Sequence, residues 1–94
     1  MMKVNEMVQI HEGYASVGGM FINEKFTTGT VVKVNAKSIR VHMTHVKCTT
    51  SGKVTREYNI NEEAAFTFWK TIETADKTVS IFKNNKYGII KVIH

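Results

Sequence analysis

The most constraining feature of this sequence is the alternation of apolar and polar residues in the segment SIRVHMT, residues 38–44. Ile39, Val41 and Met43 fall on one phase, and polar residues fall on the other. Because successive side chains of a β-strand point to opposite faces, this period of two predicts a half-buried strand. The preceding segment GTVVKV and the turn NAK complete a predicted β-hairpin over residues 29–46.

The alternation slips by one residue after Met43. His45 occupies the phase expected to face inward, whereas Val46 and Cys48 are apolar on the other phase. A β-bulge near Thr44 and His45 would restore the phase and bend the strand. Alternatively, the strand passes from one sheet to another, as at the corner of a small barrel. Both explanations predict strong curvature at this point.

Four further segments have the character of strands. Residues 3–10 fit an edge strand, with an amphipathic helix ending at Gly13 as the alternative, and residues 13–19 look like a connection. Residues 54–60 are predicted to return from a turn at 50–53. The segments TVSIF and YGIIKVI are predicted to form a second hairpin, with a turn at residues 83–86.

A short helix is predicted before that C-terminal hairpin. Asn61 is a good N-cap, and Glu62 and Glu63 would follow in the first turn, where carboxylates favour the helix dipole. Apolar residues then recur at helical spacing, although the Thr, Phe, Trp and Ile content of residues 66–74 favours a strand. We predict a helix from about residue 62 to about residue 71. Its large aromatic side chains, which are Phe66, Phe68 and Trp69, are expected in the core.

These elements predict a single, mainly β domain over residues 1–94. It would be a small curved antiparallel sheet or a small β-barrel, with one short helix before the C-terminal hairpin.

No apolar run approaches the roughly 20 residues of a membrane-spanning helix, and residues 1–13 are too polar for a signal peptide. The single cysteine excludes an intramolecular disulfide. We expect a cytoplasmic protein with no membrane partner.

Positive charge is concentrated in the middle of the sequence. Seven of the 13 Lys and Arg residues lie in residues 25–60, where Glu57 is the only acid. Such localisation is what an anionic partner requires, since Lys and Arg contact phosphates and an aromatic ring can stack on a base. The outward phase of the central hairpin would bring its basic residues onto one face. The predicted nucleic-acid-binding residues are Lys33, Lys37, Arg40, His42, Lys47, Arg56 and Tyr58.

Catalytic and metal chemistry find no support in the sequence. His42, His45 and Cys48 are residues of the type that bind zinc. On a strand, however, His42 and Cys48 lie roughly 20 Å apart and His45 points to the opposite face. No nucleophile-and-base arrangement or Gly-rich phosphate loop is present. We therefore predict no metal site, no cofactor and no enzymatic activity.

The segment GTVVKVNAKSIRV, residues 29–41, resembles the central hairpin of small β-barrel domains of the KOW and Tudor type. In those domains a glycine opens a curved strand and a short basic turn follows. The resemblance covers under a fifth of the chain. It implies a module that binds nucleic acid or peptides rather than an enzyme.

The expected function is thus that of a small, non-catalytic binding module whose basic hairpin contacts DNA or RNA. The alternative is a protein-interaction or self-assembly module, such as a homo-oligomer, with no nucleic-acid role. This alternative rests on strand edges, because an unpaired edge can pair with another chain.

Overall fold

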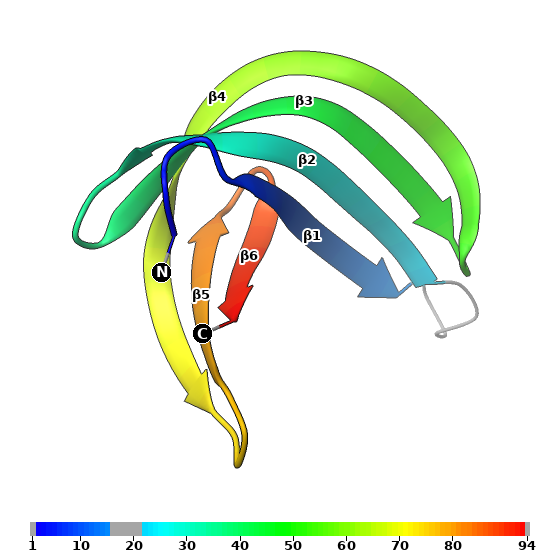
Figure 1. Cartoon of the computed structure of the whole chain (residues 1–94). Coiled ribbons are helices and arrows are strands. Elements are labelled where there is room, and N and C mark those ends of the chain that lie inside the picture. Colours follow the sequence, from blue (N-terminus) through cyan, green and yellow to red (C-terminus); the bar gives the residue numbers. More distant parts are fainter. Residues whose placement is uncertain (1, 16–21, 94) are drawn as a thin grey trace.

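The structure is a computed structural model that describes residues 2–15 and 22–93. Within these ranges the chain forms one antiparallel sheet (Figure 1). Each strand pairs with the next in sequence, and β1 returns to pair with β6, so the strands form a ring. The strands are β1 (Met7–Ala15), β2 (Ile22–Val34), β3 (Ser38–Thr50), β4 (Lys53–Glu73), β5 (Thr78–Asn84) and β6 (Gly88–Ile93). The predicted mainly β, antiparallel architecture is confirmed.

The helix predicted for residues 62–71 is wrong, because this segment belongs to the 21-residue strand β4. Its β-branched and aromatic residues have the strand preference that competed with the helical spacing. The first part of β4 pairs with β3 and its last part pairs with β5, so β4 arches over the β5–β6 hairpin (Figure 1). The described residues contain no helix, and hence none that could cross a membrane.

The central hairpin forms as predicted, with a turn between Val34 and Ser38. Of the two explanations offered for the phase slip after Met43, the β-bulge is the one that the structure shows. Thr28 pairs with His45 and Gly29 pairs with Met43, which leaves Thr44 as an extra residue on β3. This extra residue shifts the phase, so that Val46 is buried as well as Met43.

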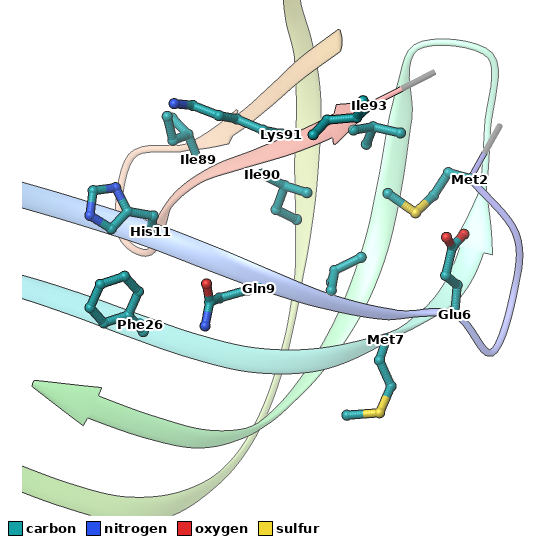
Figure 2. A pocket seen from close by; sticks show the side chains of 12 residues that line it. Met2, Glu6, Met7, Gln9, His11, Phe26, Ile89, Ile90, Lys91 and Ile93 are labelled. Atoms are coloured by element: carbon teal, nitrogen blue, oxygen red, sulfur yellow. The ribbon is translucent and has the colours of Figure 1, made fainter. Parts of the chain in front are cut away.

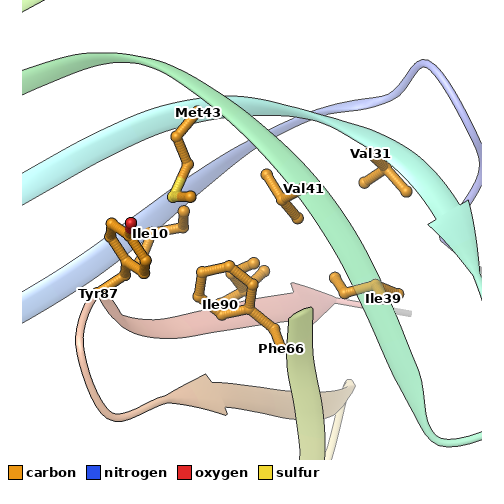
Figure 3. Close-up of a cluster of buried hydrophobic side chains, with 8 residues drawn as sticks. All are labelled: Ile10, Val31, Ile39, Val41, Met43, Phe66, Tyr87 and Ile90. Atoms are coloured by element: carbon orange, nitrogen blue, oxygen red, sulfur yellow. The ribbon is translucent and has the colours of Figure 1, made fainter. Parts of the chain in front are cut away.

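A cluster of buried side chains occupies one face of the sheet, which we call the inner face (Figure 3). As predicted, Ile39, Val41 and Met43 all belong to it. Its members come from all strands of the ring except β5, together with Tyr87 in the β5–β6 turn, so the core joins the two ends of the chain. They are Ile10, Val31, Ile39, Val41, Met43, Phe66, Tyr87 and Ile90.

The prediction that three aromatic residues of β4 lie in the core holds only for Phe66. Phe66 is fully buried, whereas Phe68 is 40% exposed and Trp69 is 48% exposed. Alternation alone puts Trp69, which is three residues after the buried Phe66, on the opposite face of β4. Trp69 is also the extra residue of a β-bulge, because Phe68 pairs with Phe82 and Lys70 pairs with Ile81.

The N-terminal strand begins later and ends later than predicted. β1 starts at Met7 rather than Lys3, and it continues through Gly13 to Ala15, where a connection was expected. The rest of that predicted connection, including Gly18 and Gly19, lies outside the described residues. β1 pairs with β2 along its whole length but meets β6 at a single pair, His11 with Ile89.

Candidate nucleic-acid interface

The seven predicted nucleic-acid-binding residues do not share one surface. Lys33 pairs with Arg40, and both lie on the outer face, opposite the core. His42 and Lys47 follow on the same face of β3, and Lys37 lies in the β2–β3 turn. Arg56 and Tyr58 belong to the inner face instead.

The inner position of Tyr58 follows from strand register. Tyr58 pairs with the buried Val46, and opposite residues of an antiparallel pair point to the same face. Arg56 lies two residues away on β4, with its guanidinium carbon 4.7 Å from the centre of the Tyr58 ring. Arg56 and Tyr58 therefore do not share a face with Arg40, although they are close to the hairpin in sequence.

β4 places carboxylates on the outer face beside the basic residues of β3. Arg40 forms an ion pair with Glu63. His45 Nε2 lies 2.9 Å from the Glu57 carboxylate, and Glu57 also pairs in register with Lys47. The middle of the outer face is thus a mixed surface rather than a basic patch.

Positive charge without such partners gathers at the other end of β4, around Trp69. The Lys70 ammonium lies 4.3 Å from the centre of the Trp69 ring, and the Lys83 ammonium lies 4.7 Å from it. The β-bulge explains this arrangement, because a bulge can turn two consecutive side chains, here Trp69 and Lys70, toward the same side of the sheet. Cations over an indole ring are attracted by its quadrupole, which holds both lysines near the ring.

The β2–β3 turn lies next to this cluster. The Phe68 amide donates a hydrogen bond of 2.8 Å to the Lys37 carbonyl, and Ser38 and Lys83 both pair with Thr67. We call this region the Trp69 surface and define it by Lys37, Trp69, Lys70 and Lys83. In residues 2–15 and 22–93, no carboxylate lies within 4 Å of these lysine ammonium groups.

Of these four residues, the sequence prediction included Lys37 alone. It missed the others because a helix was expected there, with Trp69 in the core. The strand preference of the segment FTFWKTI, residues 66–72, could have indicated a strand here instead of a helix. Trp69 and Lys70 are adjacent in that segment. Nothing local in the sequence indicated that Lys83 of β5 would reach the same ring.

A second polar cluster lies on the inner face, where the Tyr87 hydroxyl donates a hydrogen bond to the Glu62 carboxylate. Lys86 Nζ lies 3.6 Å from the same carboxylate. The Tyr87 hydrogen bond, helped by Lys86, lowers the pKa of Glu62 below its ordinary value of 4.5. The same hydrogen bond and partial burial raise the pKa of Tyr87. Because Tyr87 belongs to the core, this cluster ties β4 to the β5–β6 turn.

The histidine and cysteine side chains weighed as metal ligands are not gathered. In the described part of the chain, no three His, Cys, Asp or Glu side chains are grouped closely enough to hold a metal ion. His42 Nε2 instead lies 2.6 Å from the Asn61 side-chain oxygen, on the neighbouring strand.

Comparison with known proteins identifies no relative of this chain. The chain matches no protein-family model, no curated protein and no solved structure. The resemblance of residues 29–41 to KOW and Tudor domains therefore stays a prediction.

Proposed function

We propose that this protein is a non-catalytic binding module, built as a small β-barrel, whose Trp69 surface contacts single-stranded nucleic acid. The observation that carries the proposal is a half-exposed indole ring with two lysine ammonium groups within 5 Å of its centre. Proteins bind single strands with an aromatic ring that stacks a base and nearby cations that contact phosphates. Both ammonium groups lie over the Trp69 ring, so they would move to the flanking phosphates when a base stacks there.

The same geometry favours single strands over a duplex. A base can stack on Trp69 only if it is free of its own base stack, and such stacking contributes about 1–3 kcal/mol per base. Lys37, Lys70 and Lys83 would contact the backbone on either side of that base. We expect little sequence preference, because every base presents a π face and lysine contacts to phosphate carry no sequence information.

The net charge of +5 supports this assignment, but the distribution of charge matters more. Arg40 is paired with Glu63, so it has less charge to offer a phosphate, and the strand register sets the acid Glu57 opposite Lys47. The proposed contact region is accordingly displaced from the centre of β3 toward the β2–β3 turn and β5.

The test is binding of a labelled oligothymidylate and a labelled oligouridylate, measured by fluorescence anisotropy at low salt. We expect Lys83→Glu and Trp69→Ala each to weaken binding about tenfold or more, because one reverses a phosphate contact and the other removes the stacking ring. Lys53→Glu is the matched control, since it makes the same charge change at the exposed first residue of β4.

Trp69 is the only tryptophan, so its intrinsic fluorescence reports on the proposed site directly. Binding should quench this fluorescence with the affinity measured by anisotropy. The proposal is wrong if neither oligonucleotide binds at low salt, or if Lys53→Glu weakens binding as much as Lys83→Glu.

A further inference from the structure

The ring of strands is nearly open between β1 and β6. These strands form a single ladder pair, His11 with Ile89. If that antiparallel ladder continued, Gln9 would oppose Lys91 and Met7 would oppose Ile93, but neither pair forms. Figure 2 shows the two strands separating as they leave His11, and a cavity of about 380 Å³ lies between them.

Both walls of this cavity are strand edges. Residues 7–10 bond to β2 on one side and residues 90–93 bond to β5 on one side. On the sides that face each other, neither segment pairs with another strand of the described chain. We call this region the β1–β6 slot and define its walls as residues 7–10 and 90–93. An edge of this kind presents free backbone N–H and C=O groups that can template a further strand.

The side chains of the slot are mostly apolar. Those that point toward the core are buried or half-buried, and those at the open end are exposed. Val8 and Val92 pack against the core, beside the buried Ile90. Met7 is 70% exposed and Ile93 is 64% exposed, and they are the two most exposed large hydrophobic side chains of the described residues. They are also the two residues that a continued ladder would have placed opposite each other. Met7 and Ile93 line the same cavity, one from each wall, and exposed apolar groups that share a cavity favour a surface that is covered in use.

We propose that the β1–β6 slot binds an extended segment of a partner protein as an added strand, with apolar side chains alternating with acidic ones. Backbone hydrogen bonds to the strand edges would supply affinity, as in other cases of strand addition. The inward side chains of the segment would meet Val8, Ile90 and Val92. Its outward side chains would pass the exposed ammonium of Lys91.

The charges around the slot favour an acidic outward residue. Lys91 is the charged residue of the β6 wall. Glu6 also lines the cavity and keeps its negative charge, but it directly precedes β1, on the opposite wall from Lys91, where its carboxylate accepts a hydrogen bond of 2.9 Å from the Lys3 amide. His11 lies at the closed end, with Nε2 2.8 Å from the Glu24 carboxylate. Lys91 is therefore the charge that an incoming strand would meet beside β6.

The same lysine disfavours a second copy of this chain as the occupant. Antiparallel pairing of β6 with β6 of another copy, in the register that uses all of residues 89–93, sets Lys91 opposite its own equivalent. Like charges directly opposite each other destabilise a strand pair. A lysine on an exposed edge is also a common means of preventing such self-pairing.

The experiment uses two synthetic peptides, one alternating valine with glutamate and one alternating valine with lysine. Each is titrated into the isotopically labelled protein and followed by amide chemical shifts and hydrogen exchange. We expect the glutamate peptide to shift the amide signals of residues 90–93 and to slow their exchange. We also expect it to bind at least about threefold more tightly than the lysine peptide, from the difference between opposite and like charges across a strand pair.

Lys91→Glu should invert the preference between the two peptides, and because Lys91 is exposed this variant keeps the core intact. A glutamate peptide with N-methyl groups on alternate amides should lose about tenfold or more in affinity, because it cannot donate the strand hydrogen bonds.

Three results would overturn the proposal: no shift of residues 90–93 at millimolar peptide, shifts confined to the Trp69 surface, or the same shifts caused by raising protein concentration alone. The last result would assign the slot to a second copy. None of these readouts depends on nucleic-acid binding.

Discussion

The guanidinium of Arg40 on β3 forms an ion pair with the carboxylate of Glu63 on β4. Both side chains are nearly half exposed, so the pair contributes only about 0.2–1 kcal/mol to stability. Its larger consequence concerns binding, because it neutralises the arginine at the centre of the outer face. The lysines of the Trp69 surface have no such carboxylate partner among the described residues, so they keep their charge for an anionic ligand.

The opposite faces of β3 separate stability from binding. Val41→Ala should lower the free energy of unfolding by about 1–3 kcal/mol, because Val41 is fully buried and its loss leaves a cavity. Arg40→Ala should change it by no more than about 0.5 kcal/mol, as exposed sites usually do. Chemical denaturation of the two variants measures the difference. Equal losses would contradict the face assignment of β3.

Gly88 allows β6 to approach β1 where the ring closes. Its φ is +117°, and a Cβ at this position would overlap the His11 carbonyl. Gly52 also has a positive φ, +85°, but a Cβ there would meet nothing within 4 Å. Gly52→Ala should therefore cost about 1 kcal/mol from backbone strain alone. Gly88→Ala should cost about 1–3 kcal/mol more, from overpacking.

The free energies of unfolding of the two glycine variants, measured by denaturation, separate the two effects. Both variants strain a backbone with positive φ, but only Gly88→Ala also crowds the contact between β6 and β1. Amide exchange adds a second measurement, since the Ile89 region should lose protection in Gly88→Ala and keep it in Gly52→Ala. Similar stability of the two variants would show that contact between β6 and β1 at Gly88 is not tight.

The Glu62–Tyr87 hydrogen bond should make stability depend on pH in the acid range. The pKa of Glu62 is lowered in the folded state, chiefly by the Tyr87 hydroxyl. Its stabilising contribution is therefore complete above the ordinary value of 4.5 and is lost as pH falls through the lower folded pKa. Glu62→Gln should melt below the wild type at neutral pH.

The melting temperatures of Glu62→Gln and the wild type should converge as pH falls below 4.5. Glu73→Gln, at an exposed position near the end of β4, is the control and should follow the wild type throughout. A gap between Glu62→Gln and the wild type that stays constant with pH would show that the carboxylate charge is not responsible.

The salt dependence of oligonucleotide binding should distinguish the lysines of the Trp69 surface from Arg40. Each phosphate contact that a variant loses reduces the slope of log affinity against log salt by about 0.7 for a single strand. Lys83→Ala should show such a reduction, and Arg40→Ala should not, because Arg40 is paired with Glu63. Equal slopes for Lys83→Ala and the wild type would remove Lys83 from the contact region.

The central hairpin was predictable because its information is local. The alternation of residues 38–44 determines which side chains of β3 are buried, and the slip after Met43 marks the bulge at Thr44. The segment 62–71 was mistaken for a helix because capping residues and apolar spacing are also local signals, and here they pointed the wrong way. Pairing with β3 on one side and β5 on the other decides in favour of a strand.

The sequence by itself determined that the chain forms a mainly β domain with an excess of positive charge, since periodicity and composition are properties of residues near one another in the chain. The tertiary structure alone decided where that charge is free. Glu63 comes from β4 to neutralise Arg40, and Lys83 comes from β5 to join Trp69. These residue pairs are 23 and 14 positions apart in the sequence. Strand register and β-bulges bring them together, and no local sequence pattern carries that information.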